Sequence, residues 1–209
     1  MKEIAKKLVE IRAVKLTTPD NLFTWVSGIK SPIYCDNRLI ISYPEIRDMV
    51  AHGFADAIRA KYPDAQVIAG TATAGIPHAA WVAQILGLPM VYVRSSSKDH
   101  GTQKLIEGYM PEGSKVVLIE DLLSTGKSSV AAVKALKAEG ADVLGCLAIF
   151  SYGFPAVDNV FSDIQVPVAS LTNYGEVLEF AEETGLVKGE VKELLASWSK
   201  NPRMFTDVE

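Results

Sequence analysis

The sequence predicts an α/β fold with a mostly parallel central sheet that is flanked by helices. Apolar runs without alternation are typical of strands that are covered on both faces. Segments with helical periodicity separate these runs, so strand and helix alternate along most of the chain. The chain has 209 residues, which is enough for one domain with a sizeable core.

The N-terminal part is predicted to hold two helices and two short strands. Its first four periodic apolar residues are Ile4, Leu8, Ile11 and Leu16. Their near-helical spacing predicts a helix that is broken by residues 17–20. Residues 23–36 predict two strands joined through Ser27 and Gly28, because aromatic and β-branched residues flank the glycine. Pro44 is expected to open a second helix that continues to about Lys61.

From residue 66 onward the predicted order is strand, turn and helix. The expected strands are residues 66–70, 89–93, 115–119, 143–150 and, as a further candidate, 166–171. The expected helices are residues 79–86 and 126–138, and more helices are expected to finish the chain. This alternation is the basis for the parallel sheet.

The charge and cysteine content exclude several classes of protein. Lys plus Arg is 21 and Asp plus Glu is 25, so the net charge is −4. A nucleic-acid partner is therefore not expected, since it would favour a basic excess. No apolar run reaches the ~18 residues that span a bilayer, so no membrane association is expected. Cys35 and Cys146 form no CxxC pair, and few cysteines without an export signal predict a cytoplasmic protein.

Residues 94–110 form a polar segment between two strongly predicted strands. A loop of this length in a compact domain is usually functional or disordered. It carries four potential cations in an acidic protein: Arg94, Lys98, His100 and Lys104. A solvated surface loop is the simpler alternative, but this charge favours binding of an anion.

Residues 116–129 carry the most informative motif. A buried strand leads into the carboxylates Glu120 and Asp121, and a turn rich in Ser, Thr and Gly precedes a helix. Such a turn and helix start offer unpaired backbone N–H groups and a positive dipole end to an anion. Carboxylates at the carboxyl end of the strand lie where open α/β sheets bind ligands. Together they suit a sugar phosphate, with its phosphate on the amides and its hydroxyls on the carboxylates.

Two other interpretations of this motif carry less weight. Residues 124–128 contain Gly-Lys-Ser, as a nucleotide-binding P-loop does, but Asp121 stands where that motif needs a glycine. An ordinary strand–turn–helix with Ser124 or Thr125 as its N-cap explains the hydroxyls. It does not explain two carboxylates at the end of the strand.

The motif resembles the ribose-phosphate signature of the type I phosphoribosyltransferase family. Three further segments resemble its orotate phosphoribosyltransferase branch: residues 23–34 with Ser27-Gly28 and Lys30-Ser31-Pro32, residues 98–101 (KDHG) and residues 106–108 (IEG). The signature alone would fit enzymes for other bases, whereas the combination favours orotate. The resemblance spans most of residues 20–150.

This resemblance implies a fold, a reaction and an assembly. The expected fold is one phosphoribosyltransferase domain over residues 1–209. It comprises an N-terminal helix and hood (1–40), an α/β core (41–175) with a mobile loop (94–110), and C-terminal helices (176–209). The expected reaction joins orotate to phosphoribosyl pyrophosphate with Mg²⁺, giving orotidine 5′-monophosphate and pyrophosphate in pyrimidine biosynthesis. A homodimer in which the loop of one subunit closes over the other subunit's site is also expected.

The resemblance assigns roles to individual residues. Lys98, His100 and Asp121 are the expected catalytic residues. The expected contacts to phosphoribosyl pyrophosphate are Arg94, Lys98, His100, Glu120, Asp121, Leu122, Leu123, Ser124, Thr125, Gly126, Lys127 and Ser128. Mg²⁺ is expected to be held mainly by substrate oxygens and water, with no dedicated protein ligands.

The expected contacts to orotate are Ser124, Lys30 and Arg38. Many family members carry an Arg after the strand that follows the signature helix, whereas this chain reads Phe150-Ser151-Tyr152-Gly153. Lys30 or Arg38 is therefore the predicted partner of the orotate carboxylate. The competing hypotheses are a phosphoribosyltransferase for another base and a regulator that binds the sugar phosphate without chemistry.

Overall fold

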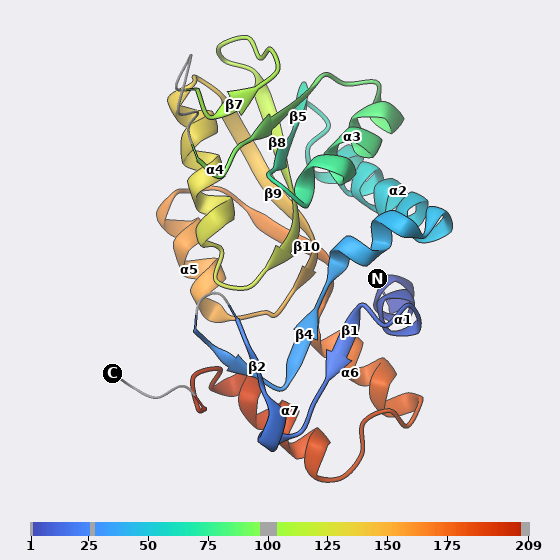
Figure 1. The fold of residues 1–209 in the computed structure, drawn as a ribbon. Coiled ribbons are helices and arrows are strands. Elements are labelled where there is room, and N and C mark those ends of the chain that lie inside the picture. Colours follow the sequence, from blue (N-terminus) through green and yellow to red (C-terminus); the bar gives the residue numbers. More distant parts are fainter. Residues whose placement is uncertain (1, 26–27, 97–103, 206–209) are drawn as a thin grey trace.

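The computed structural model describes residues 2–25, 28–96 and 104–205. Its centre is a six-stranded sheet in the order β10-β9-β8-β5-β6-β7 (Figure 1). The strands are β5 (Val67–Thr71), β6 (Met90–Val93), β7 (Ile106–Glu107), β8 (Lys115–Leu123), β9 (Asp142–Ser151) and β10 (Val168–Asn173). Every neighbouring pair is parallel except β6 and β7. The predicted α/β class with a mostly parallel sheet is confirmed.

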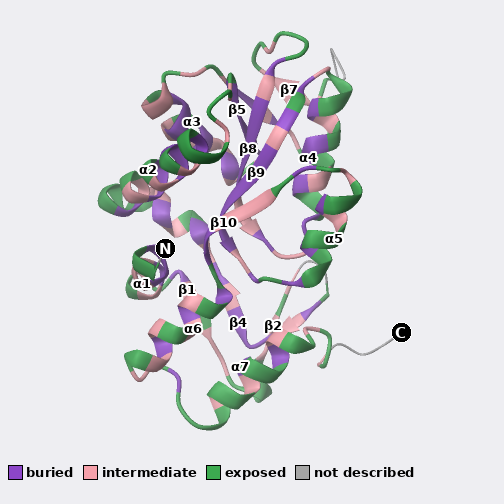
Figure 2. Ribbon diagram, turned by 180° about the vertical axis from the view of Figure 1, so that it is seen from behind, coloured by how far each residue is buried: buried purple, intermediate pink, exposed green. Residues whose placement is uncertain are grey.

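Helices cover both faces of this sheet. On one face lie α1 (Lys2–Glu10), α2 (Pro44–Lys61), α3 (Gly75–Leu86) and α6 (Tyr174–Glu183). On the other face lie α4 (Lys127–Ala138) and α5 (Pro155–Asp163). Alternate strand residues feed the two cores, so β8 sends Ile119 to one and Leu118 to the other. Both residues are fully buried, and Figure 2 shows the central strands as buried along most of their length. This two-sided burial explains the unbroken apolar runs.

The N-terminal strands form two small antiparallel sheets below the carboxyl edge of the central sheet (Figure 1). One pairs β1 (Val14–Leu16) with β4 (Ile33–Cys35), and the other pairs β2 (Phe23–Thr24) with β3 (Lys30–Ser31). Short 3-10 helices, η1 (Pro19–Asn21) and η2 (Asn37–Ser42), connect them to their neighbours. These strands are called the hood below.

The expected first helix was too long. It ends at Glu10, and Val14–Leu16 is a strand because it pairs with Ile33–Cys35 across the hood. Arg12 breaks the helix with a φ of 58°, in the left-handed region. The helical spacing of Ile11 and Leu16 therefore does not produce a helix here, because the strand pairing with residues far along the chain is more stable.

The remaining predicted elements are present, with shifted ends. The helix from Pro44 to Lys61 is confirmed with the predicted limits. α3 begins at Gly75, earlier than expected, and α5 was not expected as a separate helix. The C-terminal helices are α6 and α7 (Glu190–Lys200), as expected. The predicted division into hood, core and C-terminal helices stays a prediction.

α3 lies against β8 just before the paired carboxylates. A Cβ on Gly75 would lie 2.6 Å from the carbonyl oxygen of Ile119, so only glycine permits this approach. The start of α3 therefore rests on the backbone of the strand that carries Glu120.

Candidate functional site

The site lies at the carboxyl end of β8. This nine-residue strand is paired with β5 on one side and β9 on the other, both parallel to it. The carboxyl ends of the three strands therefore share one edge of the sheet, which faces the hood in Figure 1. Glu120 and Asp121 lie close to this end, as the sequence predicts, and an open α/β sheet binds its ligands here.

Glu120 is buried and held by two hydrogen bonds. Only 4% of the surface of Glu120 is exposed to solvent. The hydroxyl of Ser129 donates to its Oε2 at 2.9 Å, and the backbone N–H of Asp121 donates to its Oε1 at 3.0 Å. Ser129 follows the predicted phosphate turn but serves this carboxylate instead. Its role was missed because a serine one turn into a helix has no signal of its own.

The two adjacent carboxylates are difficult to ionise because both are largely buried. Burial raises the pKa of Glu120, and the neighbouring charge of Asp121 raises it further. Burial is also the main cause of the raised pKa of Asp121. A ligand that donates hydroxyl hydrogen bonds would favour the charged forms of both side chains.

The turn after β8 presents the start of α4 without a side-chain cap. Gly126 is the N-cap residue and has a φ of 75°, and α4 begins at Lys127. No side chain caps the helix, so its first N–H groups and its dipole are free to meet an anion within this described turn. Ser124 and Thr125 stand in the turn, while Lys127 and Ser128 belong to the first turn of the helix.

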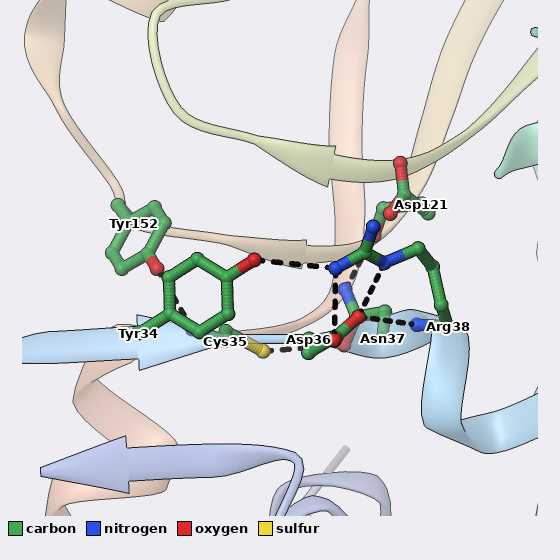
Figure 3. A network of polar contacts seen from close by, with 7 residues as sticks. All are labelled: Tyr34, Cys35, Asp36, Asn37, Arg38, Asp121 and Tyr152. Atoms are coloured by element: carbon green, nitrogen blue, oxygen red, sulfur yellow. Dashed lines mark hydrogen bonds and ion pairs between the residues drawn. The ribbon is translucent and has the colours of Figure 1, made fainter. Parts of the chain in front are cut away.

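A network of polar contacts joins the hood to this edge (Figure 3). The Asn37 side-chain amide donates to the backbone oxygen of Asp121 at 2.7 Å. The Cys35 thiol lies 3.2 Å from Asn37 Oδ1, and the Cys35 N–H donates to the Tyr152 hydroxyl at 3.2 Å. Burial raises the pKa of Cys35 and of Tyr152, so both stay protonated. Asn37 and Tyr152 thus position β8 and β9 against β4, a role that sequence patterns did not predict.

Arg38 comes next in the chain and is already engaged by a carboxylate. Its Nε donates to Asp36 Oδ1 at 2.6 Å, and its Nη2 donates to Asp36 Oδ2 at 2.9 Å. Nη2 also lies 3.3 Å from the Tyr34 hydroxyl, as Figure 3 shows. The pairing lowers the pKa of Asp36 and raises that of Arg38. A ligand anion would have to share this guanidinium with Asp36.

The cations of the long loop are only partly described. Arg94 follows β6, so it stands at the same edge of the sheet as Glu120 and Asp121. Its Nη1 lies 3.7 Å from Glu107 Oε1. Lys98 and His100 lie outside the described residues, and their roles stay predictions. Lys104 is 3.5 Å from Glu139.

A cavity of about 270 Å³ adjoins the turn after β8. Its lining residues come from the hood, the turn, the start of α5 and the C-terminal segment: Ile29, Ser124, Thr125, Phe154, Pro155, Ala156, Ser199, Lys200, Asn201, Pro202 and Arg203. Another cavity of about 230 Å³ lies by Ile58, Tyr62 and Leu88. That cavity contains neither the paired carboxylates nor the turn.

The described residues hold neither a metal-binding cluster nor a membrane-spanning helix. No group of three or more His, Cys, Asp or Glu side chains in residues 2–25, 28–96 and 104–205 is placed to hold a metal ion. Over the same ranges, no helix is long and apolar enough to cross a membrane.

Comparison with known proteins supports the class that the fold and site define. The family model of the phosphoribosyl transferase domain matches residues 42–179. The orotate phosphoribosyltransferase of Fusobacterium nucleatum is 53% identical over 201 residues, which cover 96% of this chain and 95% of that protein. With this identity over nearly its full length, the chain belongs to the orotate phosphoribosyltransferase family.

Solved structures show the same fold. The orotate phosphoribosyltransferase of Aeropyrum pernix matches with a TM-score of 0.76 and 26% identity, covering 88% of this chain and 99% of that one. The UMP synthase of Leishmania donovani matches with a TM-score of 0.82 and 26% identity. That match covers 95% of this chain, which spans only 42% of the longer protein. The predicted phosphoribosyltransferase fold is thus confirmed.

Proposed function

We propose that this chain transfers the 5-phosphoribosyl group from phosphoribosyl pyrophosphate to orotate. The products are orotidine 5′-monophosphate and pyrophosphate, and the reaction is a step of pyrimidine biosynthesis. One observation carries the proposal: Glu120 and Asp121 lie near the carboxyl end of β8, and a short turn leads from that strand to a helix start without a side-chain cap, in a chain of the orotate phosphoribosyltransferase family. The carboxylates suit ribose hydroxyls, and the helix start suits a phosphate.

The carboxylates are proposed to act on the ribose. Its 2′- and 3′-hydroxyls donate hydrogen bonds to Glu120 and Asp121, which favours the ionised forms that burial disfavours. During the reaction the bond from C1′ to the pyrophosphate oxygen breaks, and a ring nitrogen of orotate bonds to C1′. Positive charge develops on the ribose, and negative carboxylates beside it stabilise that charge.

The two phosphate groups are proposed to bind at different places. The turn of Ser124 and Thr125, Gly126 and the first turn of α4 with Lys127 and Ser128 receive the 5′-phosphate. Arg94, Lys98 and His100 neutralise the departing pyrophosphate. Arginine can hold it through two hydrogen bonds, and His100 can supply charge or a proton.

Mg²⁺ is proposed to arrive with phosphoribosyl pyrophosphate. When bound, it would supply positive charge to the pyrophosphate, and most of its ligands would be substrate oxygens and water. The hard carboxylate oxygens of Glu120 and Asp121 are compatible with a cation close by. This chain's own contribution is to orient the ribose and to hold the phosphate.

The assembly and location are proposed from the sequence. A homodimer in which residues 94–110 of one subunit close over the other's site follows from the resemblance to the family. A cytoplasmic location follows from the sparse cysteines, and in the structure Cys35 and Cys146 are both free thiols.

The deciding experiment follows orotate by its ultraviolet absorbance. Loss of orotate that needs both phosphoribosyl pyrophosphate and Mg²⁺, and that stops when a chelator is added, supports the proposal. Pyrophosphate release with uracil or a purine base, and none with orotate, would assign another base. Binding of phosphoribosyl pyrophosphate without turnover of any base would indicate a regulator.

A further inference from the structure

The C-terminal segment, residues 199–203, forms a wall of the cavity beside Ser124 and Thr125. Five of the lining residues belong to it, and the two charged side chains among the lining are both positive, Lys200 and Arg203. Neither cation has a carboxylate within ion-pair distance in the part of the chain that the structure describes. Two cations of a protein with negative net charge therefore lie at one small cavity. Their charge favours binding of an anionic group there.

Several of the other lining residues are apolar. Ile29 and Phe154 are buried at 4% and 6% exposure, and Pro155 lies beside them. Ser124 and Thr125 add hydroxyls at the end nearest β8. A flat ring that carries a carboxylate would match this lining, with the ring against the apolar residues and the carboxylate at a cation. A free phosphate would make no contact that the apolar residues favour.

The C-terminal segment is anchored on both sides. Trp198 is fully buried, and its indole N–H donates to the carbonyl oxygen of Lys30 in the hood at 3.0 Å. Its ring centroid lies 5.5 Å from that of Phe154. After α7 the chain turns, with the Met204 N–H donating to the Asn201 carbonyl at 3.0 Å, and Phe205 packs against the core. This turn holds Arg203 beside the cavity, and Figure 1 shows α7 next to β2.

We propose that Arg203, carried by this anchored C-terminal segment, binds the carboxylate of orotate. The proposal rests on the proposed function and adds a residue from the far end of the chain to the orotate site. An arginine can grip a carboxylate through two parallel hydrogen bonds, which a lysine cannot do. Arg203 is not committed to a carboxylate as Arg38 is to Asp36.

The test compares Arg203→Gln and Arg203→Lys with Lys192→Gln, a cation on α7 that pairs with Glu182 at 3.0 Å. Arg203→Gln is expected to raise the KM for orotate about tenfold to a hundredfold, the effect of losing a charged hydrogen bond, while the KM for phosphoribosyl pyrophosphate stays the same. Arg203→Lys recovers part of the loss, and Lys192→Gln behaves as wild type.

Calorimetric titration supplies a readout that is independent of turnover. Arg203→Gln should weaken binding of orotidine 5′-monophosphate and leave binding of uridine 5′-monophosphate, which lacks the carboxylate, unchanged. Equal weakening of both nucleotides would assign Arg203 to the phosphate and overturn the inference. So would an unchanged orotate KM, or a loss confined to Lys30→Gln or Arg38→Gln. If wild type neither consumes orotate nor binds orotidine 5′-monophosphate, it is the proposed function that fails.

Discussion

Asp121 separates the role of a side chain from that of its backbone. Its backbone oxygen accepts from the Asn37 side-chain amide and ties the hood to the sheet, and its carboxylate takes no part in that hydrogen bond (Figure 3). The side chain can therefore be changed without breaking the contact that positions the strand.

Asp121→Asn is expected to keep the fold and to lower kcat/KM for phosphoribosyl pyrophosphate by roughly a hundredfold, because a negative charge near the developing cation is lost. Steady-state kinetics and a melting curve measure the two effects. Asp142→Asn, the same exchange at the exposed amino end of β9, is the control and should alter neither. Loss of folding in Asp121→Asn with full activity of the folded fraction would make the carboxylate structural.

Glu120 gives the stability of the unliganded protein a dependence on pH. Its ordinary pKa of 4.5 is raised in the folded chain, mainly by burial. Below pH 4.5 the Glu120 carboxyl is protonated in both the folded and the unfolded chain. As the pH rises above 4.5, the carboxyl ionises first in the unfolded chain, so the free energy of unfolding falls.

Glu120→Gln removes this fall in the free energy of unfolding, because a side-chain amide does not titrate. The amide oxygen of the glutamine can still accept a hydrogen bond from Ser129. Urea unfolding from about pH 5 to about pH 8 should therefore show a flatter pH profile in Glu120→Gln than in wild type. Glu112→Gln, an exposed carboxylate in the turn before β8, should keep the wild-type slope. Identical slopes for Glu120→Gln and wild type would contradict the pKa shift.

At the scale of elements, the turn between β8 and α4 depends on Gly126. Its φ of 75° disfavours a side chain, and a Cβ there would lie 3.2 Å from Val160 on α5. Gly113, in the turn that precedes β8, has a similar φ of 78° and open space where a Cβ would stand. The two glycines share the backbone strain and differ in crowding.

Gly113→Ala is expected to lower the free energy of unfolding by about 1 kcal/mol, the cost of a left-handed alanine, and to leave activity intact. Gly126→Ala should lower the free energy of unfolding further. It should also raise the KM for phosphoribosyl pyrophosphate, since crowding against α5 shifts the turn at residues 124–126, which is proposed to bind the 5′-phosphate. Urea unfolding and initial rates distinguish the two. Equal losses of stability with unchanged KM would show that the turn does not need its close packing.

The hydrogen bond from Trp198 to Lys30 joins the C-terminal helix to the hood. Trp198→Phe leaves the Lys30 carbonyl without that donor and should lower the free energy of unfolding by about 1–3 kcal/mol. Trp25→Phe is the matched control, because the buried Trp25 indole N–H has no hydrogen-bond partner within the described residues. Chemical unfolding that shows the same loss for both variants would mean that ring volume, and not the hydrogen bond, holds α7.

At the scale of the whole molecule, the proposed dimer predicts complementation between two defective chains. Lys98→Ala has an intact core, and Asp121→Asn has an intact loop. If the loop closes over the other subunit's site, a mixed dimer holds one complete site, and mixing the unfolded and refolded variants restores part of the activity. Each variant refolded alone controls for its residual rate. No recovery in the mixture, with mixed dimers present, would place each loop over its own site.

The local signals in the sequence were strong where neighbours in sequence are also neighbours in space. The helix from Pro44 to Lys61, the parallel strands and the turn at residues 124–126 all follow from short-range periodicity and turn chemistry, although β8 continues to Leu123, beyond its predicted end. The strand Val14–Leu16 did not, because its partner Ile33–Cys35 lies outside any local window. Asn37, Ser129 and Tyr152 carry no pattern, and their roles exist only through contacts across the fold.

The sequence by itself predicted the parallel strands, the two adjacent carboxylates and the turn that we propose for the phosphate, because each depends on consecutive residues. Only the tertiary structure decided how the site is enclosed. Folding buries Glu120, commits Arg38 to Asp36 and brings Arg203 beside Ser124 from the opposite end of the chain. The physical reason is that burial, ion pairing and cavity walls depend on distances in space, which spacing along a sequence does not specify.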